Sequence, residues 1–118
     1  MANPNIVNVA TINGKTDVFA LTTTETSLVT ATANTVFKIN SILVSNIDGT
    51  NAADVTIKYN DGSNDRAIAS TISVPADATL AVVDKNSSFY LEETEIIKGT
   101  ASANSDLECL ISYEIISD

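Results

Sequence analysis

Apolar and polar residues alternate along most of this chain, the pattern expected of strands that bury one face. The clearest case ends the chain, where five alternating residues form one apolar face: Leu107, Cys109, Ile111, Tyr113 and Ile115. Leu110 is the exception, because it lies on the opposite face among polar residues. Val55, Ile57 and Tyr59 form a second apolar face. No helical stripe longer than two turns is present, so the pattern predicts strands throughout.

Turn residues separate the predicted strands. Asp48-Gly49 and Asp61-Gly62 bracket a strand from Ala53 to Tyr59, because glycine accepts positive φ and aspartate bonds its own backbone. Asn13-Gly14 has the composition of a type I′ turn and predicts a hairpin between Ile6–Ile12 and Val18–Leu21. The other predicted strands are Ile68–Val74, Thr79–Val83, Phe89–Leu91 and Ile96–Ala101.

The segment from Thr35 to Asn46 is apolar at positions of both parities. It therefore predicts a central strand that is partly buried on both faces, or a strand whose face changes at a bulge. About nine or ten short strands at this spacing predict an all-β fold, a single β-sandwich of jelly-roll or immunoglobulin-like type over residues 1–118. The predicted core comprises Val18, Phe37, Ile39, Leu43, Val55, Ile57, Ile72, Val74, Leu80, Val82, Leu107, Cys109, Ile111 and Tyr113.

Composition supports the all-β prediction and narrows the partners. Thr, Ile and Val number 15, 13 and 10, and such β-branched residues pack well on a pleated sheet. Fifteen Asp and Glu oppose six Lys and Arg, for a net charge of −9, which argues against nucleic acid or an anionic membrane as partner. No apolar run is long enough for a membrane span, and the opening residues do not resemble a secretory signal.

The absence of histidine excludes the common nucleophile-activating pairs and imidazole general bases. The single Cys109 alternates with apolar neighbours, which predicts a small buried hydrophobe. Glu92, Glu93 and Glu95 are the strongest candidates for paired carboxylate chemistry, but a solvated acidic turn explains them more simply. The sequence therefore predicts a protein that is not an enzyme and needs no cofactor.

The stretch Asp61-Gly62-Ser63-Asn64-Asp65 resembles a calcium-binding loop superficially. An EF-hand loop needs its glycine at the sixth position and a glutamate at the twelfth, and this stretch has neither. A looser, weak Ca²⁺ site at Asp61, Ser63 and Asp65 is the alternative to a plain hairpin loop. The hairpin loop is preferred, so no metal site is predicted.

Four longer strings resemble small virion structural proteins of marine tailed bacteriophages, especially those that infect cyanobacteria. They are MANPNIVNVATINGKT, VFKINSILVSNIDGTNAADVTI, ASTISVPADATLAVVDKNSSFYLEE and TASANSDLECLISYEIIS. The resemblance implies a β-sandwich without enzymatic activity, made in the cytoplasm of the host bacterium and carried on the virion. Its partners would be the major capsid protein or other virion proteins, and further copies of itself, most simply as a trimer.

Two locations on the particle compete. A capsid decoration, or cement, protein on the outer surface of the head is preferred, because an acidic exterior repels DNA and keeps crowded copies soluble. The alternative is a neck, tail or fibre adaptor, with host-surface binding as its further role. Two segments are predicted to contact partners: residues 1–9 as an extended N-terminal arm, and the end of the last strand. The contact residues are Asn5, Ile6, Val7, Val9, Ile115 and Ile116.

Overall fold

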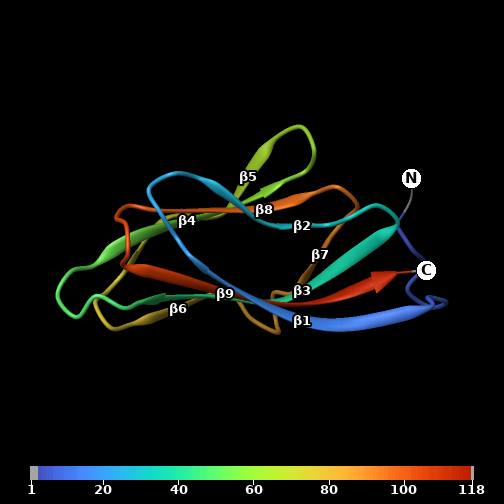
Figure 1. The fold of residues 1–118 in the computed structure, drawn as a ribbon, viewed down its shortest axis with the longest axis horizontal. Coiled ribbons are helices and arrows are strands. Elements are labelled where there is room, and N and C mark those ends of the chain that lie inside the picture. Colours follow the sequence, from blue (N-terminus) through green and yellow to red (C-terminus); the bar gives the residue numbers. More distant parts are fainter. Residues whose placement is uncertain (1–2, 118) are drawn as a thin grey trace.

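The computed structural model describes residues 3–117 and shows two antiparallel sheets packed face to face (Figure 1). Sheet A contains, in spatial order, β1 (Thr11–Ala20), β9 (Leu107–Ser117), β3 (Thr35–Asn46) and β6 (Thr79–Val83), and β7 (Phe89–Leu91) also pairs with β3. Sheet B contains, in spatial order, β2 (Thr26–Thr30), β8 (Ile96–Ala101), β4 (Ala53–Asn60) and β5 (Asp65–Val74). The predicted all-β sandwich is therefore confirmed.

The core fills the space between the sheets and is built mainly from aliphatic side chains. Six of its largest residues are fully buried: Leu21, Ile39, Ile42, Ile57, Ile97 and Ile111. Burying one such side chain stabilises the fold by roughly 1.5–3 kcal/mol. The alternating faces of β9 and β4 point into this core as predicted, with Leu107, Cys109 and Val55 almost completely covered.

The central strand β3 confirms both features expected of it. It pairs with β9 on one side and with β6 and β7 on the other. Its register against β9 shifts between Ile39 and Ser41, so a bulge at Asn40 changes which parity faces inward. Ile39 and Ile42 are consequently both fully buried although they differ in parity.

The hairpin predicted at Asn13-Gly14 is wrong. β1 runs straight through these residues, and Asn13 and Gly14 lie opposite Ile115 and Glu114 of β9. Ten successive residue pairs with β9 outweigh the local preference of an Asn-Gly pair for a turn. The chain bends earlier, where the Asn8 amide donates to the Asn5 carbonyl at 3.0 Å, so the predicted strand Ile6–Ile12 is wrong as well.

Three residues of the predicted core lie outside it. Val18 is 71% exposed and Ile72 is 41% exposed, while Leu43 is half-buried on the outer face of sheet A. Alternation shows which residues of a strand share a face, but it does not show which of the two faces points into the core. Ile72 lies opposite the buried Val55, next to a register shift and to Thr71 with its φ of 52°, but β5 is the edge strand of sheet B, so no further strand covers the Ile72 side chain. Leu80 and Val82 are partly buried against the core.

Glycines 99 and 14 provide a matched test of this packing. A Cβ at Gly99 would lie 2.8 Å from Leu28 Cδ1 and 3.2 Å from Leu21 Cδ2, whereas a Cβ at Gly14 would meet nothing within 4 Å. Gly99→Ala is therefore expected to destabilise by about 1–3 kcal/mol through overpacking. Gly14→Ala is expected to be neutral or slightly stabilising. Urea denaturation of both variants tests this, and a destabilised Gly14→Ala would contradict the strand assignment at that residue.

Candidate functional site

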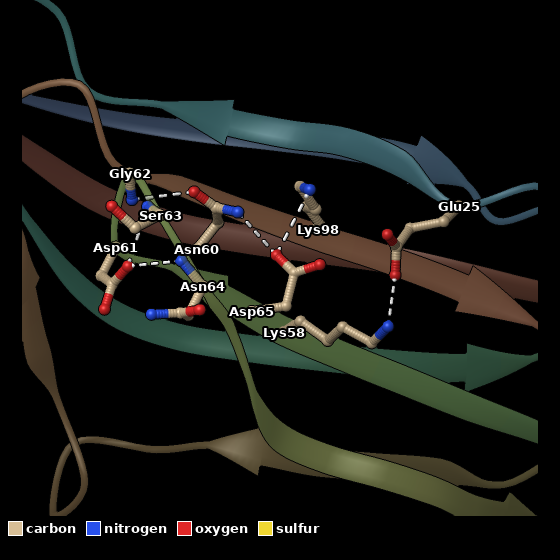
Figure 2. Close-up of polar contacts among 9 residues, drawn as sticks. All are labelled: Glu25, Lys58, Asn60, Asp61, Gly62, Ser63, Asn64, Asp65 and Lys98. Carbon is tan, nitrogen blue, oxygen red and sulfur yellow. Dashed lines mark hydrogen bonds and ion pairs between the residues drawn. The ribbon is translucent and has the colours of Figure 1, made fainter.

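The outer face of sheet B carries a balanced network of charges (Figure 2). Lys58 and Lys98 lie directly opposite each other on β4 and β8, an arrangement that would be repulsive on its own. Glu25 and Asp65 compensate, since Lys58 Nζ lies 2.9 Å from Glu25 Oε2 and Lys98 Nζ lies 3.3 Å from Asp65 Oδ1. The hydrogen bond to Glu25 also raises the pKa of Lys58. Each of the two lysines on this face is therefore paired with a carboxylate.

The β4–β5 loop uses its carboxylate to hold the turn together (Figure 2). The Asp61 Oδ1 atom accepts hydrogen bonds from the amides of Ser63 and Asn64 at 3.0 and 2.8 Å, and these bonds lower the pKa of Asp61. Asp65 accepts from the Asn60 side chain at 2.7 Å and pairs with Lys98. Within residues 3–117 no three His, Cys, Asp or Glu side chains are grouped as a metal ion requires. The geometry favours the hairpin loop over a calcium loop.

The acidic residues after β7 are also engaged in local structure. Glu93 Oε2 accepts from the Asn34 amide, and Glu95 Oε1 accepts from the Tyr59 hydroxyl and from the Glu92 amide. Burial, reinforced by the hydrogen bond to Glu95, raises the pKa of Tyr59 above its ordinary value. The carboxylates of Glu93 and Glu95 therefore stabilise the turn by accepting hydrogen bonds and are not arranged as a pair that faces a substrate cleft.

Cys109 has the environment of a core residue. Its side chain is 1% exposed, and burial raises the pKa of the thiol to about 12. A nucleophilic or metal-binding cysteine needs a lowered pKa and access from solvent. The prediction that Cys109 packs as a small hydrophobe is confirmed by its place in the core cluster.

The outer face of sheet A differs from that of sheet B, because it carries an apolar row across four strands. Val18, Leu110, Leu43 and Ala81 lie opposite one another in that order on β1, β9, β3 and β6. Directly paired residues point to the same side of a sheet, so these side chains form one continuous strip, here called the open row. Val18 is 71% exposed and Ala81 is exposed, while Leu43 and Leu110 are half-covered by their neighbours.

A depression of about 360 Å³ lies beside the open row. Two of its lining residues, Val18 and Leu110, belong to the open row. The others are Phe19, Ala20, Ser45, Glu108 and Cys109. Glu108 is the only charged side chain among them. The depression and the open row together form an apolar surface with an acidic margin.

A second apolar row crosses the same face at the other end of the strands. Ile12, Ile116 and Val36 lie opposite one another on β1, β9 and β3. Unlike the open row, this one is covered at two of its three positions. Val36 and Ile116 are each 4% exposed although neither belongs to the core between the sheets, whereas Ile12 is 55% exposed. Pro4, itself buried, lines a hollow together with Val36, so we call this the covered row.

The residues predicted to contact partners are brought together only in part. Val7 is 90% exposed, Ile6 is 49% exposed, Asn5 is exposed and Val9 is half-buried. Ile116 is buried in the covered row and Ile115 is partly buried against the core, so neither is free at the surface. Met1 and Ala2, which belong to the predicted arm, lie outside the described residues.

The open row was missed at the sequence level, although two signals pointed to it. Leu110 interrupts the polar face of the last strand, and Leu43 belongs to the segment that is apolar in both parities. Only the register between β3 and β9 shows that the two side chains are neighbours.

No protein-family model and no curated protein matches the sequence. Among solved structures, a chain of the Bacillus endospore appendages, described as disulfide-linked pili, is 13% identical with a TM-score of 0.54. That match covers 92% of this chain and 88% of the other. A chain of the acidic stable capsid of Helicobacter pylori bacteriophage KHP30 is 6% identical with a TM-score of 0.54, covering 92% and 90%. At these identities the matches show a shared fold.

Proposed function

We propose that this chain is a non-enzymatic structural protein of a bacteriophage virion, and that it decorates the outer surface of the head. The observation that carries the proposal is the contrast between its outer faces. Sheet B neutralises its lysines internally, as suits a face turned to solvent, whereas sheet A presents the open row of Val18, Leu110 and Leu43. An exposed apolar strip with a polar surround is typical of a protein-protein contact surface.

The shared fold supports the same proposal. Both structural neighbours are described as parts of large assemblies, one a phage capsid and the other a pilus. Disulfide linkage is a poor fit for this chain, because a single buried thiol joins at most two chains and is covered in the folded state. Capsid assembly requires no such chemistry, and the sequence resemblance points to marine tailed phages. The head is therefore the preferred setting, with the major capsid protein as partner and a homotrimer as the working form.

Charge favours the outside of the shell. The chain carries −9 overall, so it would be repelled by packaged DNA but stays soluble in many crowded copies. Bound across joints between capsid subunits through the open row, it would resist outward pressure by burying apolar area there. A neck, tail or fibre adaptor is the second candidate, since the same contact surface serves a ring of fewer copies.

The test is to introduce one carboxylate on each outer face and to measure copy number on particles of the phage that encodes the chain. Val18→Asp breaks the open row at an exposed position, and Ala67→Asp adds the same charge at an exposed position on sheet B. We expect Val18→Asp to lower occupancy by about tenfold or more, equivalent to at least about 1.4 kcal/mol of binding, and Ala67→Asp to leave it unchanged.

Quantitative mass spectrometry of the particles gives the copy number. Copies on the order of hundreds support decoration of the head, whereas about twelve or fewer support the neck or tail, where closed rings are small. A virion that lacks the chain altogether would overturn the proposed function. Full occupancy by Val18→Asp would overturn the assignment of the open row alone.

A further inference from the structure

We infer that the N-terminal segment Asn3–Ile6 is an exchangeable plug, and that a second copy of this chain can pack its own Asn3–Ile6 in the same place, against Glu92 and Glu93 and beside Val36. The inference extends the proposed function by naming the contact through which copies associate. It rests on the proposed function only for its setting, because a particle surface supplies the crowding that exchange requires. The segment would bind to the second copy through the buried Pro4 ring and the hydrogen bonds of Asn3, not as a strand added to a sheet.

The segment is held in place by contacts of its own. Pro4 is buried, and with Asn3 and Ile6 it forms one wall of the hollow, whose other lining residues are Val36, Tyr90 and Glu92. Asn3 is held at both ends of its amide, since its Nδ2 donates to Glu92 Oε1 at 2.7 Å and its Oδ1 accepts from the Glu93 amide at 3.2 Å. A buried proline next to an asparagine that makes two hydrogen bonds fixes the position of this segment.

Val36 of the covered row lies beside this segment. It lines the hollow together with Pro4 and Ile6 and is only 4% exposed, although it lies on the outer face of sheet A. Removing the plug would therefore expose apolar surface at Val36, on a face that already carries the open row. A neighbour's plug restores the same contacts, so the closed and exchanged forms differ little in side-chain energy, which is the condition for domain swapping.

The connection between the plug and β1 has the properties of a hinge. Its bend is held by two short-range hydrogen bonds, from the Val7 amide to Asn5 Oδ1 and from the Asn8 amide to the Asn5 carbonyl, both 3.0 Å. Val7 is 90% exposed, and Ile6 is 49% exposed, so little packing opposes extension of this stretch. The final bond before β1 is the Ala10 amide to the Ser117 carbonyl at 3.1 Å, which fixes where the hinge ends.

Charge permits the exchange. Residues 2–14 contain no Asp, Glu, Lys or Arg, whereas the whole chain carries −9. Two acidic bodies repel each other, but an uncharged segment crosses between them without adding to that repulsion. Because the hinge is short, the chain's own plug has an effective concentration of about millimolar, and exchange becomes competitive when the chain itself is that concentrated.

The experiment uses two purified single-cysteine chains in a Cys109→Ala background, which removes the native thiol. One chain carries Asn3→Cys and the other Glu92→Cys, the pair whose side chains meet in the hollow. Mixed under mild oxidation at about millimolar concentration, they are expected to form the 3–92 heterodisulfide at least about tenfold above a control mixture. The control pairs the Asn3→Cys chain with Ala67→Cys, an exposed position on sheet B.

Two further measurements keep each outcome decisive. A single chain carrying both Asn3→Cys and Glu92→Cys reports the closed form as an intrachain disulfide and the exchanged form as disulfide-linked multimers. Light scattering of the chain with its natural residues is expected to show multimers at high concentration, which Pro4→Asp reduces to monomers. Heterodisulfide at the control level, or a chain that stays monomeric at millimolar concentration, overturns the exchange. Neither result bears on copy number in virions, so the proposed function would stand or fall separately.

Discussion

Replacing Phe37 by alanine is expected to lower the free energy of unfolding by about 3–5 kcal/mol. The side chain is 5% exposed, and its ring stacks on that of Tyr113 with centroids 5.2 Å apart and planes inclined by 19°. Truncation therefore removes both the transfer energy of an aromatic ring and a favourable ring pair. Domains of this kind have total stabilities of about 5–15 kcal/mol, so the urea midpoint should fall by a large fraction.

Val18→Ala is the matched control. Alternation predicted both side chains to be in the core, but Val18 is 71% exposed on the outer face of sheet A. Its truncation is expected to change stability by no more than about 0.5 kcal/mol. Equal destabilisation by the two variants would contradict the burial of Phe37 inside and of Val18 outside, and a midpoint barely moved by Phe37→Ala would do the same.

The strands that could be predicted are those in which one parity is apolar over many residues. β9 and β4 follow this rule, and their inward residues were identified correctly because the other face is polar in β4 and, apart from Leu110 and Ile116, in β9. β2 was not predicted, since Thr26–Thr30 is short and carries Leu28 and Val29 side by side. Its identity as a strand comes from pairing with β8, with a register shift between Ser27 and Val29.

The errors arise where pairing between distant segments overrides a local preference. Asn13-Gly14 is a strong hairpin signal by itself, but β9 offers a partner for every residue of β1. The outward position of Leu43 depends on the bulge at Asn40, whose location the sequence does not reveal. In both cases tertiary pairing decides the outcome.

The candidate site required the structure for the same reason. Lys58 and Glu25 are 33 residues apart, Lys58 on β4 and Glu25 just before β2, and these two strands are not hydrogen-bonded neighbours, so no local pattern joins the pair. The open row similarly draws one residue from each of four strands. The N-terminal segment was predicted to contact partners, and that stays a prediction. Its fold back onto the domain was not predicted, because the strand-like alternation around Ile6 concealed the buried position of Pro4.

Alkaline pH is expected to destabilise this protein strongly, beginning near the ordinary pKa of a thiol. Cys109 ionises near pH 9.0 when unfolded, whereas burial raises its pKa in the folded state to about 12. Because the pKa is higher in the folded state, the buried neutral thiol contributes its full share of the free energy of unfolding below pH 9, and this share is lost as the pH rises towards 12. Three pKa units correspond to about 4 kcal/mol, to be measured as the loss of unfolding free energy in urea across this range.

Two tyrosines add to the loss at higher pH. Burial raises the pKa of Tyr59 and Tyr113. The carboxylates of Glu95 and Asp17, which accept hydrogen bonds from the two hydroxyls, raise it further. Their contribution is complete below pH 10 and falls above it. Cys109→Ala should therefore flatten the decline that begins near pH 9, and Tyr113→Phe should flatten the part above pH 10. Tyr90→Phe, at a tyrosine that is 43% exposed, serves as the control. A Cys109→Ala profile that falls as steeply as the parent between pH 9 and 10 would show that the buried thiol does not control alkaline unfolding.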